Sequence, residues 1–431
     1  MKKKKKISLA IKILIGMVLG LICGFIFKAQ HQYWTYVTDT VGTVFIRLLK
    51  MTILPLILCS IIGGIASLSN LKQLKKIGIR FIIYWLLASF LAAVTGLVWS
   101  YIIQPGVGVN LTEAAESYST EGVNLLDTLI NYIPDNVFNS LSEFSIIQVI
   151  VFAVFAGIGI STLPEGSKAK SFLSNLFDAG NDLMIRIVEM IMKLAPVGVF
   201  CLMAEVSGTL GAEVLGALGK MLLTQYIAYA TLILIIFPLI LMTIAKVNPI
   251  KHYKNVFPAM ILAFSSCSSS ATLPLTMKCA KERCGVPEDT VGLIAPPAAT
   301  INMQACCAEM AIYAVFAAQL FGRNYNIGEL ALIILLGVIM AAGVAGVPGG
   351  GIMMSAIMMQ TMGLPLTIVP WVAGIYRLID MPNTMLNVTG DTVGMVTVSA
   401  MMGDLDRDKF NADHGAEEET AEASSTEHSE Q

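Results

Sequence analysis

The stretch DMPNTMLNVTGDTVGM, residues 380–395, decides the fold class of this chain. It lies in a run that otherwise looks like a membrane-spanning helix, yet it carries two aspartates and two asparagines. At 100° per residue its polar side chains fall within about 100° of one another on one helix face: Asp380, Asn383, Thr384, Asn387 and Asp391. A carboxylate at the bilayer centre costs at least about 2.5 kcal/mol, so this face needs partners such as an ammonium group or a hard cation like sodium. An alternative is a structural bridge between Asp380 and Arg377, one turn earlier.

The whole chain has the composition of a polytopic membrane protein. Of its 431 residues 55% are hydrophobic and 13% are charged, and the mean hydropathy is +0.73. Apolar runs of roughly 20 residues, long enough to span a bilayer as helices, recur from Ile7 to Gly394. The opening MKKKKK and the apolar run behind it resemble a secretory signal, but no cleavage site follows, which favours a retained first helix. The acidic excess lies in the tail, so the net charge of -2 does not indicate nucleic-acid binding.

The charge pattern predicts the orientation of the chain. No lysine or arginine occurs between Arg80 and Lys168. The connection that carries Glu113, Glu116 and Glu121 is therefore expected outside, and both termini in the cytoplasm. The predicted helices cover residues 7–28, 42–68, 78–103, 123–163 with a break, 170–207 and 214–246. The predicted divisions are a basic N-terminus (1–6), helices 1–6 (7–246), a core of interrupted segments (247–402) and a disordered acidic cytoplasmic tail (403–431).

Three interruptions follow Lys254: SSCSSSATLP (265–274), PPAATINMQACC (296–307) and AGVPGGG (345–351). Backbone leaves a helix inside a membrane only where it is buried in protein or lines a wet cavity. Paired breaks in two halves of a chain are typical of transporters built from inverted repeats, so the first and third are interpreted as re-entrant hairpins. Their half-helix N-termini would present N–H groups to an anion such as a substrate carboxylate. A solvated serine loop and a plain glycine turn are the alternatives.

Other residues offer less specific chemistry. The eight cysteines show no C-x-x-C pair, and Cys267, Cys306 and Cys307 at the breaks are interpreted as packing rather than reactive residues. Glu309 is an intramembrane carboxylate that either carries a proton or faces an aqueous path. All four histidines are placed in connections or the tail, and no phosphate-binding loop indicates ATP hydrolysis.

Four motifs occur in a fixed order: SSSATLP (268–274), TINM (300–303), GVPGGG (346–351) and NVTGD (387–391). With FIRLLKMTILP (45–55) and APVGVF (195–200), they make the chain resemble the dicarboxylate/amino acid:cation symporters. The resemblance implies an all-α membrane protein with eight transmembrane helices and two re-entrant hairpins. It also implies a homotrimer in the cell membrane, in which helices 1, 2, 4 and 5 form a scaffold. Helices 3, 6, 7 and 8 and both hairpins would carry substrate by an elevator movement.

The resemblance also implies site residues. The substrate-binding residues would be Ser268, Ser269, Ser270, Cys306, Val347, Gly351, Asp380, Asn383, Thr384 and Asn387. Within this set Asp380 would hold the substrate ammonium and Asn387 would contact the α-carboxylate. Sodium would be bound by Ala298, Asn302, Asn387 and Asp391 at one site and by Thr300, Ala341 and Val344 at another. Sodium would act as the coupling ion, and no cofactor is expected.

The chain departs from the acidic-substrate members at the side-chain pocket. Asn383 stands where those members have an arginine, and Tyr376 where they have the aspartate that braces it. Gln304 replaces the aspartate of a third sodium site, and Glu309 lies one position before a proton-carrying glutamate. The sequence therefore predicts a sodium-coupled importer of a neutral amino acid such as serine, threonine, alanine or cysteine. The alternative is an acidic amino-acid or C4-dicarboxylate symporter of the same fold, coupled to sodium or to protons. A channel and an intramembrane enzyme are further alternatives.

Overall fold

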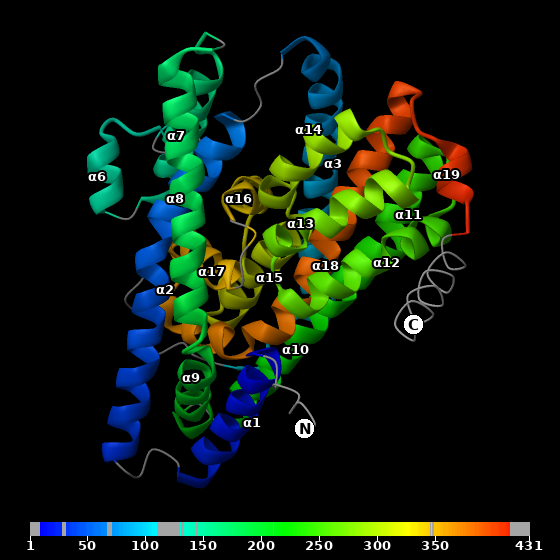
Figure 1. The fold of residues 1–431 in the computed structure, drawn as a ribbon. Coiled ribbons are helices and arrows are strands. Elements are labelled where there is room, and N and C mark those ends of the chain that lie inside the picture. Colours follow the sequence, from blue (N-terminus) through cyan, green and yellow to red (C-terminus); the bar gives the residue numbers. More distant parts are fainter. Residues whose placement is uncertain are drawn as a thin grey trace, which may run out of the picture.

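The structure is a computed structural model, and it describes residues 9–27, 32–66, 71–109, 130, 133–143, 145–164, 166–209, 211–344, 346 and 349–413. Figure 1 shows these residues as an assembly of helices, and no strand occurs among them. The predicted all-helical fold class is therefore confirmed for the described part of the chain. Helix-forming, strongly apolar runs account for this, because a helix satisfies its own backbone hydrogen bonds in lipid.

The first half of the chain forms long helices with some breaks that the sequence did not predict. They are α1 (Leu9–Phe27), α2 (Gln32–Ala66), α3 (Leu71–Ile103), α6 (Val137–Ser142), α7 (Ile146–Ser161), α8 (Lys168–Met192), α9 (Ala195–Thr209) and α10 (Gly211–Thr231). The single helix expected over 170–207 is wrong, because α8 and α9 meet at a bend of 57°. Pro196 lies in the first turn of α9, where proline's missing N–H is tolerated, so it marks a new helix start. The helix expected over 214–246 continues from α10 through η2 (Leu232–Ile236), α11 (Phe237–Ile240) and η3 (Leu241–Ala245).

The second half contains the interrupted segments. Its elements are α12 (Pro249–Ser266), α13 (Ser269–Lys278), η4 (Cys279–Arg283), α14 (Glu288–Ile301), α15 (Gln304–Leu320), α16 (Ile327–Gly343), α17 (Gly350–Thr361), η5 (Leu366–Ile368), α18 (Val369–Met402) and α19 (Arg407–Asn411). The helix breaks between α12 and α13, α14 and α15, and α16 and α17 coincide with the three predicted interruptions. Cys267 ends α12 in a left-handed conformation, and Ser268 caps α13 by accepting a hydrogen bond from the N–H of Ala271 at 3.2 Å.

The helices pack in two groups. In the first, α1 packs on α9, and α2 packs on α7, α8 and α9. In the second, α15 packs on α3, α16 and α17, while α18 packs on α10, α12 and α14. Figure 1 shows α2 and α8 side by side, with the second group next to them. The groups meet where α2 contacts α14, α16 and α17 and where α9 contacts α18.

The outer surface of the helices carries the apolar side chains expected of a protein surrounded by lipid. By length and composition, four helices within the described residues could cross a membrane, or five if the bent pair α8 and α9 counts as one span. The four are Tyr36–Ala66, Lys76–Ile103, Val214–Ala245 and Glu288–Leu320. On α3 a row of large apolar side chains is exposed, including Ile82, Ile83, Leu86 and Phe90. Apolar side chains are stable on a surface that lipid covers.

The structure differs from the sequence prediction in two further respects, at the C-terminal end and at His252. Residues 403–413 are described and include α19, whose Phe410 is fully buried. The disordered tail can therefore begin no earlier than residue 414, and residues 414–431 lie outside the described residues. The placement of His252 in a connection is wrong, because it lies in α12, is fully buried, and its Nε2 is 3.1 Å from the hydroxyl of Thr392. Helical periodicity could not predict that His252 lies in a helix. The reason is that α12 begins at a proline, and only two residues separate it from the residue that caps η3. The other three histidines lie outside the described residues.

Candidate functional site: a pocket between α15, the hairpins and α18

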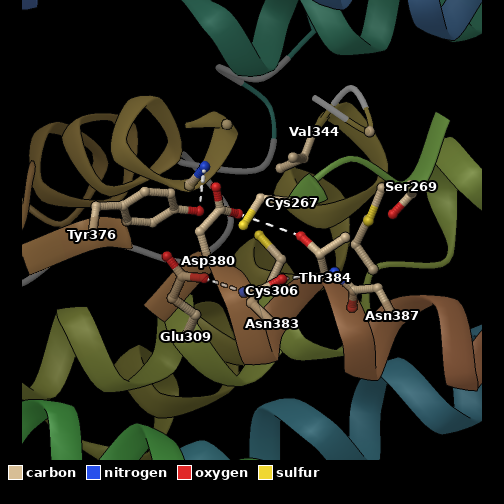
Figure 2. A pocket seen from close by; sticks show the side chains of 14 residues that line it. Cys267, Ser269, Cys306, Glu309, Val344, Tyr376, Asp380, Asn383, Thr384 and Asn387 are labelled. Atoms are coloured by element: carbon tan, nitrogen blue, oxygen red, sulfur yellow. Dashed lines mark hydrogen bonds between the residues drawn. The ribbon is translucent and has the colours of Figure 1, made fainter. Parts of the chain in front are cut away.

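The main candidate site is a small pocket in the second group of helices. Its walls come from the breaks between the half-helices, from the start of α15 and from the polar face of α18. The described residues that line it are Cys267, Ser269, Met303, Cys306, Glu309, Val344, Gly346, Gly350, Gly351, Tyr376, Asp380, Asn383, Thr384 and Asn387. Figure 2 shows their side chains converging on one space, with Asp380 and Glu309 on one side and Thr384 and Asn387 on the other.

The polar face of α18 lies against this pocket, as its helical periodicity predicts. Asp380, Asn383, Thr384 and Asn387 are one or two turns apart along the helix and are all at most 5% exposed. Asp380 accepts a hydrogen bond from the backbone N–H of Gly349 at 3.2 Å and a long one from the Thr384 hydroxyl at 3.4 Å. These neutral donors leave the carboxylate without a counter-charge in direct contact. A substrate ammonium would supply one.

The alternative bridge between Asp380 and Arg377 does not form. Among the ion pairs within 4.0 Å in the described part of the chain, none joins these two residues. Arg377 instead donates through Nη2 to the backbone carbonyl of Ser265 at 3.2 Å, and its buried Nε has no hydrogen-bond partner among the described residues. Arg377 lines a separate small cavity near Phe45 and Met192 and is absent from the described lining of the main pocket. Asp380 lines both cavities.

A second carboxylate, Glu309, enters the pocket from α15. All described residues of α15 except Gln319 are buried, and Glu309 is fully buried among them. Its Oε2 accepts a hydrogen bond from Nδ2 of Asn383. The carbonyl oxygen of Asn383 accepts from Nδ2 of Asn387 at 2.7 Å, so both ends of the Asn383 amide are engaged. Asn383 therefore ties α18 to α15 at the place where the related acidic-substrate proteins were expected to carry an arginine.

The two hairpins meet directly at Gly346. Its backbone carbonyl accepts a hydrogen bond from the Ser268 hydroxyl at 2.8 Å and another from the backbone N–H of Ser270 at 3.2 Å. A Cβ at residue 346 would lie 2.6 Å from the backbone oxygen of Ala299. Because this oxygen belongs to the backbone, no side-chain rotation could relieve the clash. Gly351 brings the second hairpin onto α18, where its N–H donates to the Tyr376 hydroxyl at 2.9 Å. These contacts close the pocket to a space of about 20 Å³, which is room for little more than one water molecule.

The predicted substrate residues are mostly brought together. Ser269, Cys306, Gly351, Asp380, Asn383, Thr384 and Asn387 line the pocket. Ser268 joins the two hairpins instead, and Ser270 lines a different cavity next to α2 and α8. Val347 lies outside the described residues.

Sequence reasoning did not assign Cys267, Met303, Glu309 or Tyr376 to the substrate pocket, although all four line it. Glu309 carried a signal, because it is a carboxylate inside an apolar helix. Tyr376 carried a signal too, because the resemblance placed it at the side-chain pocket beside Asn383. Cysteine and methionine occur throughout apolar segments, so only their neighbours in space identify Cys267 and Met303.

The predicted residues of the first sodium site lie partly together. Asn302 donates through Nδ2 to Oδ1 of Asp391 at 2.7 Å, and its backbone N–H donates to the carbonyl of Ala298 at 2.9 Å. Gln304, which replaces the expected carboxylate, donates through Nε2 to Oδ1 of Asn302. Asn387 faces the pocket and accepts from the N–H of Ala305 at 2.8 Å.

The residues of the second predicted sodium site line different spaces. Val344 lines the main pocket, and its N–H donates to the carbonyl of Ala341 at 3.4 Å. Thr300 lines the cavity of about 290 Å³ next to α2 and α8, together with Ser270. Its hydroxyl donates to the carbonyl of Pro297 at 2.9 Å.

Comparison with known proteins shows which family this chain is similar to. Residues 9–401 match the profile of the sodium:dicarboxylate symporter family. The proton/sodium-glutamate symport protein of Geobacillus stearothermophilus is 33% identical over 417 residues, which cover 94% of this chain and 97% of that protein. The proton/glutamate-aspartate symporter of Escherichia coli is 28% identical over 424 residues, covering 94% and 96%. A C4-dicarboxylate transport protein of Pseudomonas savastanoi is 28% identical over 418 residues, covering 94% and 88%.

Proposed function

This chain belongs to the sodium:dicarboxylate symporter family, and we propose that within this family it is a cation-coupled importer of a neutral amino acid. The match to the family profile over residues 9–401 confirms the resemblance seen in the four motifs. The protein is a multi-pass membrane transporter rather than an enzyme. Its family needs no cofactor, since sodium acts as a coupled ion.

The charge of the pocket is the observation that carries the neutral-substrate proposal. Two carboxylates, Asp380 and Glu309, face it, and none of its described lining residues is a lysine, arginine or histidine. A substrate ammonium at Asp380 compensates one negative charge. A carboxylate on the substrate side chain would lie against Glu309 without a cation, and an unpaired charge removed from water is strongly unfavourable.

A second candidate is favoured by the relatives. The proteins compared above are named as carriers of glutamate, aspartate or C4-dicarboxylates, so the comparisons support an acidic substrate better than a neutral one. An acidic amino acid would still place its ammonium at Asp380. A C4-dicarboxylate has no ammonium, and it would leave both Asp380 and Glu309 to be neutralised by protons or cations.

For the transport step we propose that the α16–α17 hairpin is the gate of the pocket. The pocket is too small for an amino acid while the hairpin contacts α18, so the Gly349–Asp380 and Gly351–Tyr376 contacts must break to admit one. The second group of helices would then move past the first as an elevator, in a homotrimer, as the resemblance implies. Sodium would bind near Asp391 and Asn302, and Gln304 in place of a carboxylate favours fewer than three sodium ions.

Uptake into proteoliposomes tests the proposal. Labelled serine, alanine, threonine, cysteine, aspartate and succinate would each be offered with an inward sodium gradient, an inward proton gradient, or neither. We expect saturable, sodium-dependent accumulation of one or more neutral amino acids and weak uptake of aspartate. Strong accumulation of aspartate or succinate would replace the proposal with the second candidate. Flux that neither saturates nor accumulates would indicate a channel.

A further inference from the structure

Glu309 has a carboxylate oxygen that the chain leaves unsatisfied. Its Oε2 accepts from Asn383, but its Oε1 is buried and has no hydrogen-bond partner among the described residues. A buried acceptor without a donor is unfavourable, and more so when it carries charge. Glu309 lines the substrate pocket, so a donor that enters the pocket would satisfy this oxygen.

Most neighbouring side chains are engaged elsewhere; the exception is Tyr313, whose buried hydroxyl lies beside Glu309 and likewise has no hydrogen-bond partner among the described residues. Nδ2 of Asn383 donates to Oε2 of Glu309, and its Oδ1 is occupied by Asn387. The hydroxyl of Tyr229 donates to Oε1 of Gln225 at 2.7 Å. Arg377 donates to the carbonyl of Ser265 and is absent from the described lining of this pocket.

Gly351 lies directly against Oε1 in this closed arrangement, so a substrate can reach this oxygen only when the α16–α17 hairpin opens as proposed above. A Cβ at residue 351 would collide with Oε1 of Glu309 and with the hydroxyl of Tyr376. Figure 2 shows Glu309 next to Asn383, on the same side of the pocket as Asp380 and Tyr376. A substrate held by its ammonium at Asp380 therefore has Glu309 within the same pocket.

We propose that Glu309 determines side-chain specificity, because its free oxygen accepts a hydrogen bond from a donor group on the substrate side chain. The assignment rests on the proposed function, in which Asp380 takes the ammonium of an amino acid. The favoured neutral substrates then carry a hydroxyl or a thiol on a short side chain, and a side-chain ammonium is a stronger donor that probes the same oxygen. Side chains of the same size that end in a methyl group leave Oε1 unsatisfied, and acidic side chains are repelled.

Three isosteric amino acids test the assignment, because their β-carbons carry a hydroxyl, an ammonium or a methyl group. They are serine, 2,3-diaminopropionate in its cationic form, and 2-aminobutyrate. Competition binding would be measured for these and for aspartate on wild type and on Glu309→Gln. Glu282→Gln, at an exposed position, is the matched control. Uptake as a function of pH would be recorded on the same proteins.

On wild type we expect serine and 2,3-diaminopropionate to bind at least about tenfold more tightly than 2-aminobutyrate, since a hydrogen bond to a charged group has that magnitude. In Glu309→Gln the amide oxygen must serve Asn383, so the NH₂ group faces the pocket. The advantage of 2,3-diaminopropionate should then disappear, while 2-aminobutyrate changes by less than about threefold. Glu282→Gln should leave all ratios unchanged.

Two results would overturn the assignment and leave the proposed function in place. One is wild-type binding of the three isosteres with equal affinity. The other is a Glu309→Gln protein in which the affinity ratios between the three isosteres are unchanged. If uptake by that protein has also lost its pH dependence, Glu309 is assigned to proton transfer instead. Tightest binding of aspartate by wild type, or no binding of any neutral amino acid, would overturn the proposed function and the assignment together.

Discussion

Asp380 and Asn383 lie one turn apart on α18, and the residues around them decide what each can bind. Within the described part of the chain, the hydrogen-bond donors to Asp380 are neutral: the Gly349 N–H and the Thr384 hydroxyl. Asn383 has none of its amide groups free, because Glu309 and Asn387 occupy both ends. In the proposed mechanism Asp380 is therefore available to an ammonium, whereas Asn383 acts mainly by positioning Glu309.

Replacing Asp380 tests its role. Asp380→Asn should abolish amino-acid uptake, because an ammonium buried without its charged partner costs about 3–5 kcal/mol, or more than a hundredfold in affinity. The measurement is equilibrium binding with uptake in proteoliposomes, and Asp289→Asn at the exposed start of α14 serves as the control. Near-normal affinity in Asp380→Asn would show that the carboxylate is structural.

Asn383 gives a prediction that depends on Glu309. Asn383→Arg should weaken binding of neutral amino acids, but it should not create an aspartate site, because the guanidinium would pair with the adjacent Glu309. Asn383→Arg combined with Glu309→Gln frees the guanidinium, and aspartate affinity should then rise by about tenfold or more over the single variant. Competition binding of aspartate and serine to both proteins checks this. Tight aspartate binding by the single variant would show that Glu309 does not neutralise an arginine at residue 383.

The sequence alone suggested a different partner for that arginine. By resemblance, an aspartate at residue 376 would brace an arginine at residue 383. In the structure the Tyr376 hydroxyl accepts the N–H of Gly351, so removing it also removes a contact that closes the second hairpin. We therefore expect Tyr376→Asp to impair transport of every substrate.

At the scale of elements, the junction of the two hairpins depends on one glycine. Gly346→Ala places a methyl group against the backbone oxygen of Ala299 and next to Ser269, so the hairpins must separate. Backbone shifts of this kind cost about 1–3 kcal/mol, and we expect a loss of substrate affinity of about fivefold or more. Gly292→Ala on α14 is the control, because a Cβ there meets nothing within 4 Å. Wild-type affinity in Gly346→Ala would show that the closed junction is not needed for binding.

At the scale of the whole molecule, the two helix groups meet at a cavity lined by α2, α8, α13 and α14. A Cβ at Gly64 would lie 3.7 Å from the hydroxyl oxygen of Thr300, close enough for a disulfide between cysteines at the two positions. If the groups slide past each other during transport, oxidised Gly64→Cys/Thr300→Cys should lose uptake and recover it on reduction. Cys59 lines the same cavity, so the experiment uses a Cys59→Ser background, with each single cysteine variant as control. Full uptake by the cross-linked protein would contradict an elevator movement at this interface.

Much of this architecture could be predicted from the chain. The apolar runs, the three interruptions and the polar face of α18 all rest on local rules, namely helix length in a bilayer and 3.6-residue periodicity. These rules placed Asp380, Asn383, Thr384 and Asn387 on one face, and they line one pocket in the structure. The bend between α8 and α9 was missed although Pro196 carried a local signal for it. The burial of His252 was missed because its partner, Thr392, lies on a helix distant in sequence.

Only the tertiary structure decided how the polar residues pair. The sequence by itself determined that two carboxylates lie on α18 and that a third, Glu309, lies in an apolar helix. It could not determine that Glu309 meets Asn383 across 74 residues of chain, or that Arg377 turns to Ser265 rather than to Asp380. A helix fixes the direction of its own side chains but not the identity of its neighbour. The charge of the pocket, and hence the substrate that it favours, follows from which helices come together.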